Sequence, residues 1–357
     1  MRILHLLNDS CNLGNGIVNV AIDLACLQRQ SGHTVAVAAG PPKNGVQDYG
    51  SLLKQYSVQQ FSLDQTRTPH KLLAAVWRYR KIIKDFQPTI VHAHMMTGIV
   101  LAKALQFKSN YRLVSTVHSD FQHSAILMGL ADQVIAVSHA VATKMQNRGI
   151  PQHKFRVVHN GTIGSPRQPP LQSYTPVSLK RPAIVTVAGL YHRKGIAELI
   201  TEFNQVAQAI PTANLYLVGD GPDRHQFETQ AKASPFAHRI HFEGFQPEPW
   251  RYLRSTDAFV LPSRHEAFGL VLSEAREAGC AIVANRVDGI PEALDNGQAG
   301  LLISPHNSNS FAKALIRLLT NKKYLAHWQQ MSQQNLKKLD AHRVCQETLA
   351  IYQELTR

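Results

Sequence analysis

Short apolar segments alternate with longer amphipathic segments along the whole chain. The amphipathic segments, such as residues 17–30 and 71–85, have the apolar spacing of helices with one buried face. This alternation is typical of βα units, in which helices join parallel strands. The expected strands are 2–7, 34–39, 89–93, 112–117, 133–137 and 156–159 in the first half, and 183–188, 214–218, 239–242, 258–261, 281–284 and 300–303 in the second.

One segment, residues 166–182, separates the two series of strands. It contains five prolines and no apolar periodicity, so we interpret it as a linker. A chain of 357 residues also suits two domains. We therefore predict an α/β fold of two Rossmann-like, doubly wound domains, at 1–165 and 183–335, that face each other across a cleft. Residues 336–357 are expected to form a helix that crosses back to the first domain.

Composition narrows the class of protein. With 44% hydrophobic and 17% charged residues, the chain resembles an ordinary soluble globular protein. The apolar run at its start is too short for a signal peptide, and no stretch approaches the roughly 20 apolar residues of a membrane span. The four cysteines are scattered without CxxC spacing, which is typical of reduced thiols. A cytoplasmic protein is the expectation.

The formal net charge of +14 favours partners that carry phosphate or negative charge. Lys and Arg are spread through the chain without an uninterrupted basic arm, so we expect no specific nucleic-acid partner. Peripheral contact with an anionic membrane, at its inner face, is a further expectation.

The strongest candidate site follows the expected strand 258–261. A turn, then Gly269 and the start of a helix would place several backbone N–H groups and a helix dipole at one point, which is an anion-binding arrangement. Glu266 precedes the helix and Glu274 lies more than one turn inside it. Taken singly, each glutamate is also typical of an ordinary helix. Together they suggest contacts at opposite ends of one long ligand, such as a nucleotide sugar.

The segment 258–275, with seven residues between Glu266 and Glu274, resembles the retaining glycosyltransferases of family four, which have the GT-B architecture. The resemblance extends over nearly the whole chain. Its further motifs, in the expected order, are 12–16, 91–94, 116–118, 137–138, 158–161, 194–195, 217–222 and 242–245.

This resemblance implies transfer of a sugar from a nucleoside-diphosphate sugar, with a UDP-sugar favoured, to a hydroxyl of a lipid-linked or lipopolysaccharide-type glycan. It implies catalytic roles for Glu266, His118 and Lys194. Asp120 and Asn160 are weaker candidates for the acceptor side. The family works without a bound metal, and the nucleotide sugar is a substrate, so no cofactor is expected. The residues expected to bind the donor are Gly16, Arg193, Lys194, Gly244, Phe268, Gly269, Leu270 and Glu274.

Two positions depart from known patterns. Family members usually carry an arginine five residues before Lys194, where this sequence has Gly189. Either Arg193 supplies the second cation, or the diphosphate is held by one charge fewer. Asn19 stands where a dinucleotide fingerprint would have its third glycine, which disfavours a nicotinamide cofactor.

Other interpretations remain open. His92 and His94 face the same way on a strand and permit metal ligation, but no carboxylate-rich metal motif accompanies them. A nucleotide-sugar epimerase or hydrolase of the same fold is one alternative function, and a non-catalytic basic binding protein is another. For the transfer itself, Glu266 either forms a covalent intermediate or the leaving phosphate deprotonates the acceptor on the same face; we favour the second.

Overall fold

The computed structural model describes residues 1–357 except 13, 42–46, 67 and 306–309. Its contacts divide the chain into unit 1, Met1–Gln168 with Lys338–Arg357, and unit 2, Pro169–Lys337. The division falls between Gln168 and Pro169, inside the segment interpreted as a linker.

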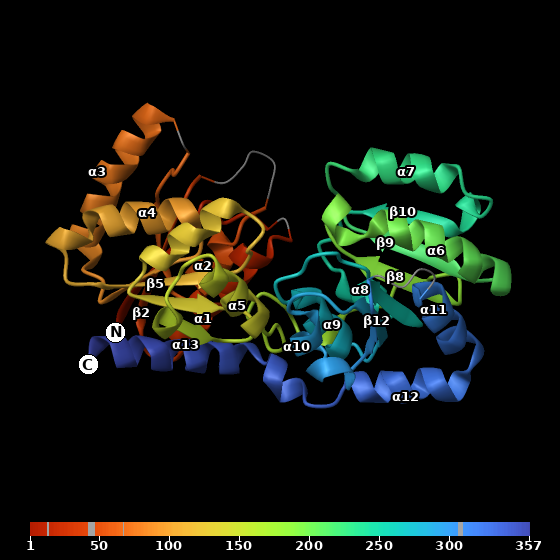
Figure 1. Ribbon diagram of the computed structural model, residues 1–357. Helices are drawn as coiled ribbons and strands as arrows, with labels where there is room; N and C mark the ends of the chain where they lie inside the picture. Colours follow the sequence, from red (N-terminus) through yellow and green to blue (C-terminus); the bar gives the residue numbers. More distant parts are fainter. Residues whose placement is uncertain (13, 42–46, 67, 306–309) are drawn as a thin grey trace. The chain divides into compact units, whose positions relative to one another are not determined.

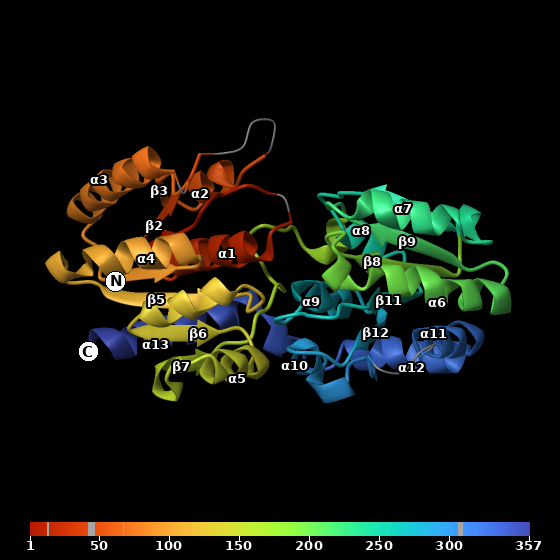
Figure 2. The same ribbon diagram turned by 45° about the horizontal axis from the view of Figure 1, so that its top comes forward.

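Unit 1 is built on a parallel sheet with the strand order β3-β2-β1-β4-β5-β6-β7. Figure 2 labels β3, β2, β5, β6 and β7 of this sheet. The chain begins in the middle of the sheet and crosses once, from β3 to β4, as in a doubly wound fold. Figure 1 shows α4 and α13 on opposite faces of this sheet. The elements are β1 Arg2–Leu6, α1 Gly16–Gln30, β2 Thr34–Ala39, α2 Gly50–Gln55, β3 Gln59–Ser62, α3 Pro69–Phe86, β4 Ile90–Ala93, α4 Met96–Leu105, β5 Arg112–Val117, β6 Gln133–Ala136, α5 His139–Asn147, β7 Phe155–Val157 and α13 Ala341–Thr356.

Unit 2 repeats the design with the order β10-β9-β8-β11-β12-β13, of which Figure 2 labels β9, β8, β11 and β12. All of its strand pairs are parallel, and the single crossover runs from β10 to β11. The fold class predicted from the sequence, α/β with two Rossmann-like domains, is confirmed. The elements are β8 Ala183–Val187, α6 Ile196–Ala209, β9 Asn214–Val218, α7 Arg224–Lys232, β10 Ile240–Gly244, α8 Trp250–Leu253, β11 Ala258–Leu261, α9 Leu270–Glu277, β12 Ala281–Asn285, α10 Ile290–Ala293, β13 Leu301–Ile303, α11 Ser310–Thr320 and α12 Lys322–Ser332.

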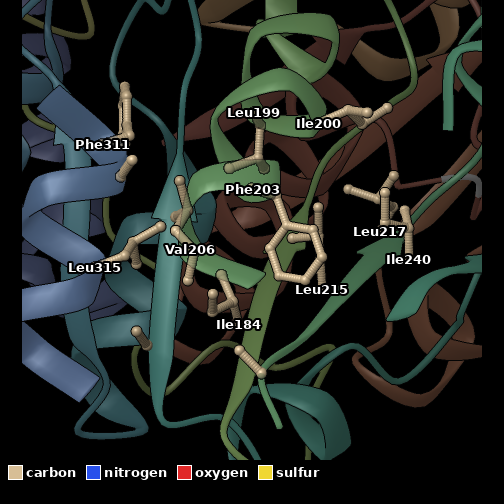
Figure 3. Packing of buried hydrophobic residues seen from close by; sticks show 14 of the residues in the cluster. Ile184, Leu199, Ile200, Phe203, Val206, Leu215, Leu217, Ile240, Phe311 and Leu315 are labelled. Atoms are coloured by element: carbon tan, nitrogen blue, oxygen red, sulfur yellow. The ribbon is translucent and has the colours of Figure 1, made fainter. Parts of the chain in front are cut away.

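The two faces of the unit 2 sheet bury different side chains. Ile184 and Leu215 point to the face covered by α6 and α11, where Phe203 lies at the centre of the core (Figure 3). The next residues along the same strands, Val185 and Tyr216, pack on the other face. Buried apolar side chains of this size contribute roughly 1.5–3 kcal/mol each to folding. The core therefore fixes the strand register, and with it the loops at the carboxyl edge of the sheet.

No helix in the described part of the chain has the length and apolar character needed to cross a bilayer. The four cysteines are buried and unpaired. Burial raises the pKa of the Cys26, Cys280 and Cys345 thiols to about 12, so these groups are inert at neutral pH.

Candidate active site

The strand order of unit 2 reverses between β8 and β11, which are neighbours in the sheet. Loops that follow the two strands therefore meet at the carboxyl edge, where doubly wound folds bind ligands. The first loop ends in a short 3-10 turn, η5 His192–Lys194, and the second leads into α9.

These two loops touch through their backbones. Gly195 has φ +70°, and a Cβ there would lie 2.0 Å from the carbonyl oxygen of Pro262, so only glycine fits. The Arg264 N–H donates a hydrogen bond of 2.8 Å to the Arg193 carbonyl. The contact brings residues from both loops to one point.

Lys194 and Glu266 form an ion pair at this point, and each side chain is only 14% exposed. The Ser263 hydroxyl donates a further hydrogen bond of 3.3 Å to the same carboxylate oxygen, Oε2. Two of the three residues predicted to be catalytic thus lie in direct contact, although they are 72 positions apart in sequence.

A third loop, after β12, holds the backbone of Glu266. The Glu266 N–H donates to the Asp288 carboxylate at 3.0 Å, and the Glu266 carbonyl accepts from the Gly289 N–H, also at 3.0 Å. His265 Nδ1 lies 3.4 Å from the same Asp288 carboxylate. Because both backbone groups of Glu266 are engaged, its side chain leaves the loop in a fixed direction.

The start of α9 lies next to this ion pair in sequence. Gly269 is its N-cap, with φ +87°, and neither a side-chain cap nor an acidic residue occupies the first turn. The N–H groups of this turn are therefore suited to an anion. Phe268 is 2% exposed, so only its backbone can contact a ligand, whereas Leu270 and Glu274 are half-buried.

Arg276 anchors the other end of α9. Its fully buried guanidinium donates to the carbonyls of Ala293, Ser332 and Gln334, and it pairs with Asp295 at 2.9 Å. Burial lowers the pKa of Arg276, and Asp295 opposes the shift. The helix that carries Glu274 is thus held rigidly in unit 2.

Gly189, which stands where family members usually carry an arginine, packs against a neighbouring aromatic ring. A Cβ at Gly189 would lie 2.7 Å from Cε2 of the Tyr191 ring, so a larger residue requires that ring to move. The Arg193 guanidinium lies over the same Tyr191 ring, 5.1 Å from the ring centroid. Tyr191 thus occupies the space of a side chain at 189 and contacts the neighbouring cation at 193.

The remaining donor-side candidates lie at strand and helix ends. Gly244 ends β10 with φ +69°, and its carbonyl accepts from the Gly219 N–H at 2.8 Å. In unit 1, Gly16 begins α1, and the Asn15 side chain caps this helix by accepting from the Ile17 N–H at 3.1 Å. Leu13, part of the same glycine loop, lies outside the described residues.

His118 lies directly after β5 and is half-buried. Its Nε2 is 3.0 Å from Nδ1 of His94, and Nε2 of His94 is 2.9 Å from Nδ1 of the buried His5. His5 Nε2 in turn donates to Oε1, the side-chain amide oxygen of Gln28 on α1, at 2.8 Å. Burial lowers the pKa of His5 to about 4 and that of His118 to about 3.

His92 belongs to a separate branch of this buried group. Its Nδ1 is 2.5 Å from the hydroxyl of Tyr352, on α13, and its Nε2 is 2.7 Å from that of Thr116. His5, His92 and His94 are close enough to share a metal ion. However, every ring nitrogen of the three already has a hydrogen-bond partner, so the arrangement fits a neutral hydrogen-bonded cluster.

The two acceptor-side candidates are buried. Asp120 is 1% exposed, and the Lys144 ammonium lies 2.8 Å from its carboxylate, so an acceptor would have to compete with this ion pair. Asn160 is 6% exposed. Beside it, Gly161 packs so closely on Leu339 that a Cβ would lie 2.3 Å from the Leu339 carbonyl oxygen.

Sequence reasoning missed several residues that support the site. No motif that was singled out contains Asp288, Tyr191, His5 or Gln28, and Ser263, inside the segment 258–275, was given no role. A sequence signal existed for His5, a histidine inside an otherwise apolar strand, and for Asp288, which begins an Asp-Gly pair typical of turns.

The sequence matches two glycosyltransferase families, one in each unit. Residues 14–162 match Glycosyltransferase Family 4, and residues 173–335 match Glycosyl transferases group 1. The chain belongs to glycosyltransferase family 4. This membership confirms the resemblance inferred from the motifs, and it makes the chain an enzyme of the glycosyltransferase class.

Among curated relatives of this family 4 glycosyltransferase is the lipopolysaccharide core biosynthesis glycosyltransferase LpsD of Rhizobium meliloti, 24% identical over 77% of this chain and 74% of LpsD. Another is the N,N'-diacetylbacillosaminyl-diphospho-undecaprenol alpha-1,3-N-acetylgalactosaminyltransferase of Campylobacter jejuni, 22% identical over 87% of this chain and 88% of the relative. Among solved structures, Anabaena HepE in complex with UDP and glucose superposes with a TM-score of 0.82 and 19% identity, over 99% of this chain and 100% of HepE. The last similarity supports the fold.

Proposed function

We propose that this glycosyltransferase moves a sugar from a UDP-sugar to a hydroxyl of a lipid-linked or lipopolysaccharide-type glycan, with retention of the anomeric configuration. The observation that carries the proposal is the Lys194–Glu266 ion pair, held beside the N-terminus of α9 at the switch point of unit 2. It offers a cation, an acid and the N-terminus of a helix within one short stretch of the chain's surface.

The ion pair suits a reaction in which opposite charges develop. When the bond from the anomeric carbon to the phosphate oxygen breaks, the sugar ring becomes positive and the diphosphate gains negative charge. Lys194, Arg193 and the N–H groups at Gly269 would hold the diphosphate. Glu266, released from Lys194, would accept hydrogen bonds from the sugar and stabilise its ring. His118, which the family resemblance assigns to the donor sugar, would bind a sugar hydroxyl.

Retention requires the acceptor to attack from the face that the diphosphate leaves. We propose that the acceptor oxygen forms the new bond on this face while its proton passes to the departing phosphate oxygen. The alternative is a covalent bond between Glu266 and the sugar. The contact between Glu266 and Lys194 is compatible with either route, and a role for Glu266 as a charge stabiliser needs no second displacement.

The names of the relatives support the proposed substrates. LpsD is named for the lipopolysaccharide core, the Campylobacter enzyme for a diphospho-undecaprenol acceptor, and HepE was solved with UDP. We further propose that catalysis needs no metal ion, because Lys194, Arg193 and the α9 N-terminus supply positive charge for the diphosphate.

Helix α3 would bring unit 1 to an anionic membrane that carries such an acceptor. Leu73 and Trp77 are 67% and 73% exposed, one turn apart on this helix. Arg80 and Lys84 continue the same stripe, at positions seven and eleven residues after Leu73, and both are exposed. An apolar tip flanked by cations is typical of a helix that lies at a lipid surface.

The test is the stereochemistry of the product. The purified protein would be incubated with UDP-glucose, UDP-galactose and UDP-N-acetylglucosamine, each with lipid-linked or lipopolysaccharide-core acceptors. Proton NMR of the new linkage should show the α configuration of the donor, and EDTA should leave the rate unchanged. A β-linked product, or UDP release that does not depend on acceptor, would contradict the proposal.

A further inference from the structure

Three histidines of unit 1 form a continuous line from a buried amide to the edge of the sheet. The line runs from Gln28 through His5 and His94 to His118, with successive separations of 2.8, 2.9 and 3.0 Å. The ring planes of His5 and His94 differ by 25°, and those of His94 and His118 by 29°. Nearly coplanar rings with centroids 5.2 and 5.3 Å apart are the geometry of in-plane N–H···N hydrogen bonds.

Each of these rings carries a single proton at neutral pH. His5 and His94 are fully or almost fully buried, and burial lowers the pKa of all three histidines. A neutral imidazole has one N–H donor and one bare nitrogen that accepts. A line of such rings therefore has only two ordered states, in which all the hydrogen bonds point one way or all point the other.

The Gln28 side chain selects one of the two states. Its carbonyl oxygen cannot donate, so His5 must carry its proton on Nε2. Nδ1 of His5 is then bare and accepts from Nε2–H of His94. In the same way, Nδ1 of His94 accepts from Nε2–H of His118.

We propose that Gln28, His5 and His94 are positioning residues that hold His118 as its Nε2–H tautomer. The outer nitrogen of His118, Nδ1, is then a permanent hydrogen-bond acceptor. No described residue hydrogen-bonds to this atom. A bare nitrogen fits a hydroxyl group of a sugar and rejects a phosphate or carbonyl oxygen, which would need a donor. The assignment of the hydroxyl to a sugar rests on the proposed function; the tautomer does not.

The direct test is the tautomer of His118 in the full-length protein. Long-range ¹H–¹⁵N correlation spectra of histidine-labelled protein distinguish the two neutral tautomers, and the His118→Asn variant assigns the signal. The expected spectrum shows the proton of His118 on Nε2. A proton on Nδ1 would overturn the proposal, whether or not the protein transfers any sugar.

The second test removes the amide. Gln28→Met keeps the size of the side chain but has no carbonyl, so we expect His118 to become a mixture of both tautomers. Thr116→Val is the matched control, because it breaks a buried hydrogen bond of His92 without touching the line. An unchanged His118 tautomer in Gln28→Met would contradict the role of Gln28.

Kinetics add a readout that loss of stability alone would not move. At a temperature where both variants are folded, Gln28→Met should lower kcat/KM for the donor roughly tenfold, the loss expected for one hydrogen bond, while Thr116→Val stays within about twofold of wild type. Equal losses of kcat/KM in the two variants would show that the line of histidines only supports the fold and does not position His118. If no variant, wild type included, transfers sugar, the proposed function fails, while the spectra still decide the tautomer.

Discussion

Lys194 and Glu266 neutralise each other in the structure, and a diphosphate would separate their roles. An ion pair this far from bulk water is costly to break without compensation, because each charge needs a new partner. In the proposed function, a bound diphosphate would provide that partner for Lys194, and the developing charge of the sugar would provide one for Glu266. The pair would then hold the two side chains in place before the donor binds.

The two glutamates of the motif should affect different kinetic constants. We expect Glu274→Ala to raise the donor KM roughly tenfold with little change in kcat, and Glu266→Ala to lower kcat by roughly a hundredfold or more. Glu277→Gln, on the same helix, is the control and should change neither. Steady-state kinetics with varied donor provide the measurement, and wild-type constants in either variant would refute its assigned role.

Arg193 should supply the second cation that Gly189 cannot. Because Tyr191 fills the space beside Gly189 and contacts the Arg193 guanidinium, we expect Arg193→Met to weaken UDP binding roughly tenfold. Arg264→Met, in the adjoining loop, removes an arginine that pairs with Glu198 instead, and should leave the affinity unchanged. Thermal-shift titration with UDP measures both, and equal affinities in the two variants would show that the diphosphate is held by one charge fewer.

The sequence predicted the candidate residues better than their contacts. Spacing and resemblance identified Glu266 and Lys194 separately, but their ion pair depends on the pairing of β8 with β11, which spacing does not encode. The contacts that lead from His118 to Gln28 could not be predicted for a similar reason. His5 and Gln28 belong to β1 and α1, and only the three-dimensional packing of α1 on the sheet brings the Gln28 amide to His5.

At the level of elements, apolar segments predicted the strands well and missed one. The expected strands agree with the observed ones within about two residues at their ends. β3, Gln59–Ser62, was not predicted because it is an edge strand with mostly exposed, polar side chains, so it shows no apolar alternation. The short helix α2, Gly50–Gln55, buries a single residue and was missed for the same reason.

Helix α3 yields a prediction of its own. Replacing both Leu73 and Trp77 by Ser should reduce binding to vesicles that contain phosphatidylglycerol at least fivefold, because both side chains would insert at the lipid surface. Phe245→Ser, which removes an exposed aromatic residue from unit 2, is the control. Co-sedimentation with phosphatidylglycerol and phosphatidylcholine vesicles measures the effect. Equal binding by wild type to both lipids, or no loss in the double variant, would contradict a membrane role for α3.

The whole molecule should lose stability as the pH falls below about 6.5. Burial lowers the pKa of the buried histidines His5, His92 and His94 in the folded protein. As the pH falls, these side chains are therefore protonated at a higher pH in the unfolded chain than in the folded one. Their contribution is complete above the unfolded pKa of 6.5 and is lost as the pH falls from there toward about 4, the folded pKa of His5. Each such histidine adds about 1.4 kcal/mol per pH unit within this window.

Urea unfolding between pH 7 and pH 4 measures this slope. His92→Gln should make the free energy of unfolding less dependent on pH by about one proton, because His92 is completely buried and lies outside the line that ends at His118. His225→Gln, an exposed histidine on α7, should leave the slope unchanged. The same slope in wild type and His92→Gln would show that His92 does not titrate as a buried neutral ring.

Binding of UDP tests most directly whether the loops after β8 and β11 hold the donor diphosphate. Isothermal titration calorimetry would compare wild type with Lys194→Met and with Lys232→Met, which removes an exposed lysine of α7 from the same unit. We predict that Lys194→Met weakens UDP binding at least tenfold, about 1.4 kcal/mol, while Lys232→Met binds like wild type. Undiminished UDP binding in Lys194→Met would contradict the site.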